Sequence, residues 1–67
     1  MKIISQDENE TLISTSFLRQ TDKAILVENI DDEEVWLPLS QVEVIEQCEG
    51  MCEVIVPNWL AESKGVI

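Results

Sequence analysis

Residues 23–37 read KAILVENIDDEEVWL, two short apolar runs on either side of an acidic turn. The first run, residues 23–29, is short and rich in branched side chains, which is typical of a β-strand. Asp31 and Asp32 favour a turn, because aspartate is depleted in strands and common in turns. The chain then returns as a second short strand over residues 34–37. This pattern predicts a β-hairpin.

Further strands are expected on both sides of the hairpin. Residues 11–18 mix β-branched, apolar and hydroxyl side chains, which suits a strand, although their large apolar residues are also spaced compatibly with a helix. Residues 41–45 (QVEVI) alternate polar and apolar side chains, as a half-buried strand does. A turn at Glu49 and Gly50 then leads to a last strand over residues 52–56 (CEVIV).

The C-terminal residues predict a short helix that packs on these strands. Pro57 suits the first helical position, where its missing N–H costs nothing, and Gly65 suits the residue after the helix. Two turns are too short to be stable alone, so Trp59 and Leu60 are expected to pack on the sheet. The expected fold is mostly β: a small barrel or bent antiparallel sheet of four to five strands with a short C-terminal helix, in a single domain of residues 1–67.

The composition is strongly acidic. The chain contains 14 Asp and Glu, 4 Lys and Arg and no His, which gives a formal net charge of −10 at pH 7. No base occurs from residue 24 to residue 63, where most of the acids lie. Nucleic acid and anionic membrane surfaces would repel such a chain, so neither is expected to bind directly. A basic protein is the expected partner, with the alternative that the acids only keep a small protein soluble.

Neither the cysteines nor the acids predict a metal site or a catalytic centre. Cys48 and Cys52 supply two ligands, whereas a structural zinc site needs four and the chain has no His or further Cys. The contiguous acids of residues 31–34 lack the alternate spacing and the glycine of a calcium loop. We therefore predict no metal, no cofactor and no enzymatic activity. The two cysteines are expected to be reduced and at least half-buried, and a disulfide across the turn stays open as an alternative.

Three segments resemble small acidic proteins encoded by bacteriophages and prophages: residues 23–27 (KAILV), 34–42 (EVWLPLSQV) and 56–65 (VPNWLAESKG). Their most specific parts are the strings WLPxSQ and VPxWLAxxKG. Leu39 stands where a basic residue commonly follows the proline in those proteins. The resemblance implies a phage origin, the cytoplasm of a bacterial host and no catalytic residues. The absence of a long apolar run near residue 1 also predicts a cytoplasmic protein.

The candidate binding residues are acids of the base-free stretch together with one aromatic side chain. Trp36 and Trp59 are expected in the core, and either becomes an interface candidate if it lies exposed beside acids. We predict that a basic surface of a host protein, one that otherwise binds nucleic acid, is bound by Glu28, Asp31, Asp32, Glu33, Glu34 and Glu43, with Trp36 as an apolar anchor.

Two alternatives stay open. In the first, the chain forms a homodimer through a β edge, which would enlarge the thin core of so short a chain. In the second, it is the nucleic-acid-binding module of a phage recombination cassette. That role would require all four basic side chains on one face: Lys2, Arg19, Lys23 and Lys64.

Overall fold

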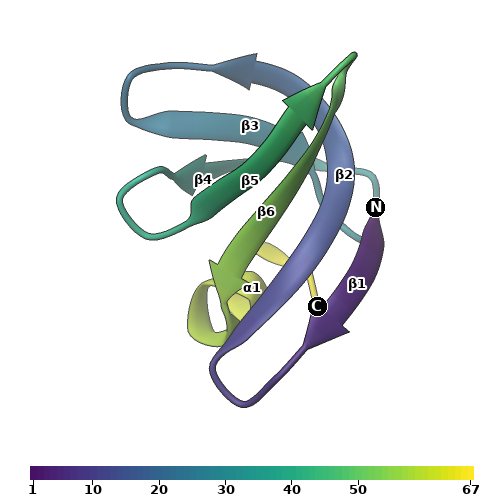
Figure 1. The fold of residues 1–67 in the computed structure, drawn as a ribbon, viewed down its shortest axis with the longest axis vertical. Helices are drawn as coiled ribbons and strands as arrows, with labels where there is room; N and C mark the ends of the chain where they lie inside the picture. The colour runs from purple at the N-terminus through teal and green to yellow at the C-terminus, as the bar shows by residue number, and fades with distance from the viewer.

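The computed structural model describes all 67 residues, which form six β-strands and one helix. The elements are β1 (Lys2–Gln6), β2 (Glu10–Gln20), β3 (Ala24–Glu28), β4 (Glu34–Pro38), β5 (Glu43–Cys48), β6 (Met51–Pro57) and α1 (Asn58–Lys64). The strands are antiparallel in the order β4-β3-β2-β6-β5, with β1 also paired to β2. The sheet is strongly bent and not closed (Figure 1). The mostly-β bent sheet with a short C-terminal helix is therefore confirmed, with one strand more than expected.

The long strand β2 links the two halves of the sheet. Its first part pairs with β1 on one side and β6 on the other, and its last part pairs with β3. Thr11, Ile13 and Thr15 are buried, and the residues between them are half-buried. This alternation has the period of two that a strand imposes, so the ambiguous residues 11–18 form a strand.

The additional strand is β1. All five of its residues are exposed, so it lacks the apolar alternation by which a half-buried strand is recognised. It exists because it pairs with β2, where Lys2 lies opposite Ser14 and Ile3 lies opposite Ile13. The pairing closes a hairpin over the turn of residues 7–9, but β1 has no alternation of apolar and polar residues from which the strand could be predicted.

The core lies on the concave side of the bent sheet, under α1. Its buried apolar residues are Ile13, Ile25, Val27, Leu37, Cys52, Val54 and Val56 of the strands, and Leu60, Ala61 and Val66 of the C-terminal segment. Buried polar groups are paired: the Thr15 hydroxyl donates to the Glu28 carbonyl oxygen at 2.7 Å. No buried side-chain nitrogen or oxygen lacks a partner, which avoids the cost of unsatisfied polar groups.

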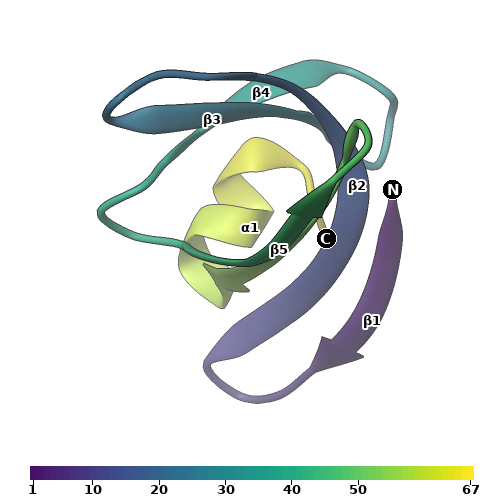
Figure 2. The ribbon, with the colours of Figure 1, turned by 45° about the horizontal axis from the view of Figure 1, so that its top comes forward.

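Helix α1 runs from the β1–β2 turn to the β3–β4 turn across the open end of the sheet (Figure 2). At its start, the Asn58 backbone N–H donates to the Asn9 carbonyl oxygen and the Asn58 side chain donates to the Asp7 carbonyl oxygen, both at 2.9 Å. At its end, the Asn29 side chain donates to the Lys64 carbonyl oxygen at 3.1 Å. Tertiary contacts at both ends thus stabilise a helix too short to persist alone.

The ends and the packing of α1 differ in part from expectation. Gly65 adopts the predicted left-handed conformation after the helix, with φ 75°. Pro57 precedes the helix as its N-cap, with an extended ψ of 141°, and is not the first helical residue. The expectation that Trp59 packs in the core was wrong, because its side chain is 61% exposed. Neighbouring helix residues point about 100° apart, and here Leu60 and Ala61 face the core.

Candidate functional site

Six of the seven predicted binding residues lie on the β3–β4 hairpin. Glu28, the last residue of β3, stands directly opposite Glu34, the first residue of β4. Leu26 and Trp36 are the next outward pair, because alternate residues share a face and Ile25 points into the core. We call this outer face and the adjoining turn the hairpin surface; it comprises Leu26, Glu28, Asp31, Asp32, Glu33, Glu34 and Trp36.

The acidic turn of the hairpin surface is held in place by Asn29. Its side-chain oxygen accepts hydrogen bonds from the backbone N–H groups of Asp31 and Glu33, at 2.9 and 3.0 Å. Asn29 is only 4% exposed, and its own backbone N–H donates to the Glu33 carbonyl oxygen at 2.8 Å. Asp32 has a positive φ of 62°, a conformation that aspartate tolerates better than most residues. The exposed turn carboxylates therefore stand on a hydrogen-bonded backbone.

Trp36 is on the outer face and not in the core. The expected core position was wrong, since its side chain is 39% exposed while the next residue, Leu37, is fully buried. Strand alternation is the cause, because Leu37 takes the inward position and Trp36 must then point outward. Trp36 thereby meets the condition for an interface candidate, an exposed aromatic ring on the same face as Glu34.

Glu43 lies apart from the other six predicted residues. It begins β5 and faces Ile55 of β6, whereas Glu28 and Glu34 belong to β3 and β4. β4 and β5 are the two ends of the strand order, and Figure 2 shows them on different sides of α1. The bend of the sheet separates the outward faces of its two halves. The acids therefore form more than one group, and the prediction that Glu43 binds together with the other six residues is corrected.

A second acidic face covers the outer side of β1, β2, β6 and β5. Glu46 of β5 stands directly opposite Glu53 of β6, and Ser14 of β2 stands opposite Glu53 on the other side. Leu12 stands opposite Ile55 in the next row. We call this the four-strand face; its outward residues are Lys2, Ser5, Glu10, Leu12, Ser14, Ser16, Glu43, Glu46, Cys48, Met51, Glu53, Ile55 and Pro57. The alternation of residues 41–45 predicted Glu43 on the face opposite to Val44, whereas Glu46 reaches the same face as Glu43 only through the register shift between Val44 and Glu46.

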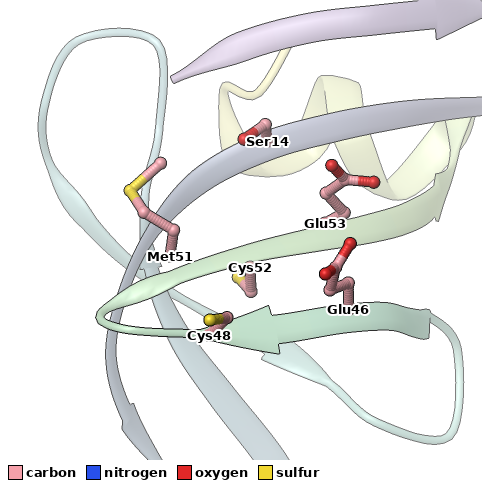
Figure 3. A pocket seen from close by; sticks show the side chains of 6 residues that line it. All are labelled: Ser14, Glu46, Cys48, Met51, Cys52 and Glu53. Carbon is pink, nitrogen blue, oxygen red and sulfur yellow. The ribbon is translucent and has the colours of Figure 1, made fainter.

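The four-strand face is hollowed. Figure 3 shows one hollow in which the carboxylates of Glu46 and Glu53 lie beside each other on neighbouring strands, with Met51 at the far end. Two more hollows lie on the same face, and Glu10 and Ile55 line both of them. Apolar and carboxylate side chains thus line the same shallow depressions, an arrangement suited to amphipathic side chains of a partner.

The two cysteines are free thiols in different surroundings. Cys52 is buried and faces Gln47 across the strand pair, while Cys48 is exposed and faces Met51. Burial raises the pKa of the Cys52 thiol, which keeps it protonated and unreactive. The expected burial is thus confirmed for Cys52 and wrong for Cys48. No three His, Cys, Asp or Glu side chains are placed to hold a metal ion.

No protein-family model, curated protein or solved structure matched this chain. No helix has the length and apolar character needed to cross a membrane. Because no relative indicates a function, the inference of function rests on the chemistry of the hairpin surface and the four-strand face.

Proposed function

We propose that the protein is a non-catalytic binding protein whose hairpin surface occupies a basic, nucleic-acid-binding surface of a host protein. The observation that carries the proposal is the pair Glu28 and Glu34, directly opposite each other beside the acidic turn. Like charges directly opposite in a sheet are destabilising, and a cationic partner would relieve that repulsion. Trp36, exposed on the same face, would supply the apolar anchor.

In this role the carboxylates would stand in for phosphates, as in a DNA mimic. Alternate carboxylates on one strand lie ~6.6 Å apart, whereas a DNA strand carries one phosphate per ~3.4 Å of axis, so one strand of acids is too sparse. The hairpin surface combines Glu28 and Glu34 with the three acids of the turn between them. A phage-type inhibitor of a host defence enzyme, acting in the bacterial cytoplasm, would work in this way by competition.

The test uses a variant in which the four contiguous acids are neutralised: Asp31→Asn, Asp32→Asn, Glu33→Gln and Glu34→Gln. Host proteins retained by the immobilised wild-type chain at low salt, and released at high salt, are identified and purified. We expect wild-type protein to displace labelled DNA from the purified partner in proportion to its concentration. The variant should lose this displacement.

A matched control changes the net charge by the same amount elsewhere: Glu8→Gln, Asp22→Asn, Glu49→Gln and Glu62→Gln. It should displace DNA almost as well as wild type, because these exposed acids lie outside the hairpin surface. Equal loss in both variants would mean that total charge and not this surface matters. Undiminished displacement by the hairpin variant would refute the proposal.

The alternative of a homodimer through a β edge has less support. Strands β1, β4 and β5 each have one free edge, and each carries a feature that discourages strand pairing. β4 ends at Pro38, which has no N–H to donate. The register is interrupted between Ile3 and Ser5 in β1 and between Val44 and Glu46 in β5. We expect one mass, that of the monomer, across a dilution series.

The alternative of a nucleic-acid-binding module also lacks a supporting observation. Lys2 belongs to β1, Arg19 lies near the end of β2, Lys23 follows in the β2–β3 turn and Lys64 ends α1. Only Arg19 and Lys23 adjoin the same turn, and four bases against 14 acids leave a net charge of −10, which a phosphate backbone repels. A gel shift at low salt with short duplex DNA should give no complex.

A further inference from the structure

We infer that the four-strand face is a second docking surface, and that it fits a cationic amphipathic segment of another protein. It lies on the other half of the sheet from the hairpin surface, and it shares no residue with it. The inference therefore holds whether or not the hairpin surface has the role proposed above. Three hollows, apolar side chains and paired carboxylates on this one face support the inference.

The outward side chains of β6 alternate in character along the strand. Met51, Glu53 and Ile55 point outward, because Cys52, Val54 and Val56 are buried. Alternate residues on a strand lie about 6.6 Å apart, so an acid stands at the centre with an apolar side chain on either side. Met51 is 47% exposed, and Ile55 is half-buried. A partner needs a cation flanked by apolar side chains to match this pattern.

The centre of the face carries an unrelieved like-charge pair. Glu46 and Glu53 are cross-strand neighbours, a placement that costs stability in a sheet. On the other side of Glu53 stands the neutral Ser14, and Lys2 comes one strand further, at the sheet edge. A guanidinium group placed between the two carboxylates would convert this repulsion into charge-assisted hydrogen bonds.

A second copy of the chain is a poor occupant. Two chains with a formal net charge of −10 each would bring acidic faces together. Four strands spaced ~4.8 Å apart and about seven residues of ~3.3 Å each cover roughly 400 Å². A stable complex usually buries about 800 Å² per partner, so the face is the size of a contact with a segment. Its charge requires that segment to be basic.

The probe is a nine-residue peptide with an acetylated N-terminus and an amidated C-terminus. Its even positions hold serine, and its odd positions hold leucine and arginine in turn. In an extended chain these side chains share one face at the spacing of β6. One matched peptide carries citrulline, the neutral analogue, for each arginine, and another carries serine for each leucine. Each is titrated into the full isotope-labelled chain while backbone amide shifts are recorded. We expect saturable shifts confined to the four-strand face for the first peptide and little response to the other two.

Variants locate the site. Glu53→Gln and Glu46→Gln should each raise the peptide Kd about threefold, as loss of one exposed ion pair does. Glu62→Gln, on an exposed helix position, and Glu28→Gln, on the hairpin surface, should leave the Kd unchanged. Met51→Ser should weaken binding without unfolding the chain, because Met51 is largely exposed.

Two results would overturn the inference. Equal binding of the arginine and citrulline peptides would remove the electrostatic basis, and shifts spread over all acidic segments would indicate unspecific attraction. The two surfaces share no residue, so failure of the peptide to bind would leave the proposed DNA displacement by the hairpin surface intact. Loss of displacement in the hairpin variant likewise leaves peptide binding to the four-strand face unaffected.

Discussion

The side-chain nitrogen of Asn29 lies 3.1 Å from the carbonyl oxygen of Lys64 and donates a hydrogen bond to it. This contact joins the turn that carries the acids of the hairpin surface to the last turn of α1. The oxygen of the same side chain accepts from Asp31 and Glu33. One buried amide therefore orders the turn and ties down the helix end, whose last carbonyl groups lack partners within the helix.

Replacement of Asn29 by alanine should destabilise the protein by about 2 kcal/mol, because it removes three partly buried hydrogen bonds to the backbone. Urea unfolding measures the change. Asn9→Ala is the matched control; Asn9 is exposed, so its loss should stay within about 0.5 kcal/mol. Equal stability of the two variants would contradict the role given to Asn29. The amide signals of Asp31 and Glu33 should also lose protection from solvent exchange in Asn29→Ala.

Gly65→Ala should destabilise more than Gly50→Ala. Both glycines have positive φ, 75° and 81°, so alanine at either position should cost about 1 kcal/mol of backbone strain. A Cβ at Gly65 would also lie 3.0 Å from the Asn29 side-chain nitrogen, whereas nothing lies within 4 Å at Gly50. Thermal unfolding of both variants measures the difference. With Asn29→Ala, the effect of Gly65→Ala should shrink, and strict additivity would show that the close contact is unimportant.

Leu60→Ala should destabilise the protein more than Trp59→Ala, although tryptophan has the larger side chain. Leu60 is 5% exposed and belongs to the core, so its truncation should cost about 2–4 kcal/mol. Trp59 is 61% exposed, and its truncation should cost under about 1 kcal/mol. Chemical denaturation of the two variants gives both values. A larger loss for Trp59→Ala would mean that the ring packs on the sheet as the sequence predicted.

The pKa of Asp7 is lowered below the ordinary 3.8, chiefly because its carboxylate accepts backbone hydrogen bonds from Asn9 and Glu10. A lowered folded-state pKa gives stability that is present above 3.8 and is lost as pH falls through the folded value. Asp7→Ala should therefore be less stable than wild type at neutral pH, and the difference should vanish in acid. Unfolding curves of both proteins, recorded from neutral pH into acid, test this prediction. A difference in stability that does not change with pH would disprove the linkage. The Asp7 carboxyl carbon should titrate below 3.8 by NMR.

The two thiols should react at very different rates. Cys48 is exposed, while Cys52 is buried and has a raised pKa, which lowers its thiolate fraction. A disulfide-exchange reagent at mildly alkaline pH should label one thiol rapidly and the other only as the protein unfolds. Cys48→Ser should remove the fast phase, and Cys52→Ser should leave it unchanged. Two fast phases in the wild-type chain would contradict the burial of Cys52.

Local sequence was sufficient for the elements that short-range chemistry specifies. The β3–β4 hairpin was predicted because two apolar runs flank Asp31 and Asp32, and the helix end because Gly65 accepts a left-handed conformation. The candidate residues on the hairpin surface came together because they are neighbours on one hairpin. Glu43 did not join them, since its place depends on how far the sheet bends and on its pairing with Ile55.

The amino-acid sequence by itself determined a mostly-β, strongly acidic chain with a hairpin and a short closing helix, because propensity, turn chemistry and charge are properties of adjacent residues. Tertiary structure alone decided that β1 pairs with β2, that Trp36 and Trp59 face outward, and that Glu46 meets Glu53 across two strands. These outcomes depend on strand register, which shifts within β1 and β5, and on the bend that gives each half of the sheet its own outer face. A one-residue change of register would turn every side chain of a strand to its other side.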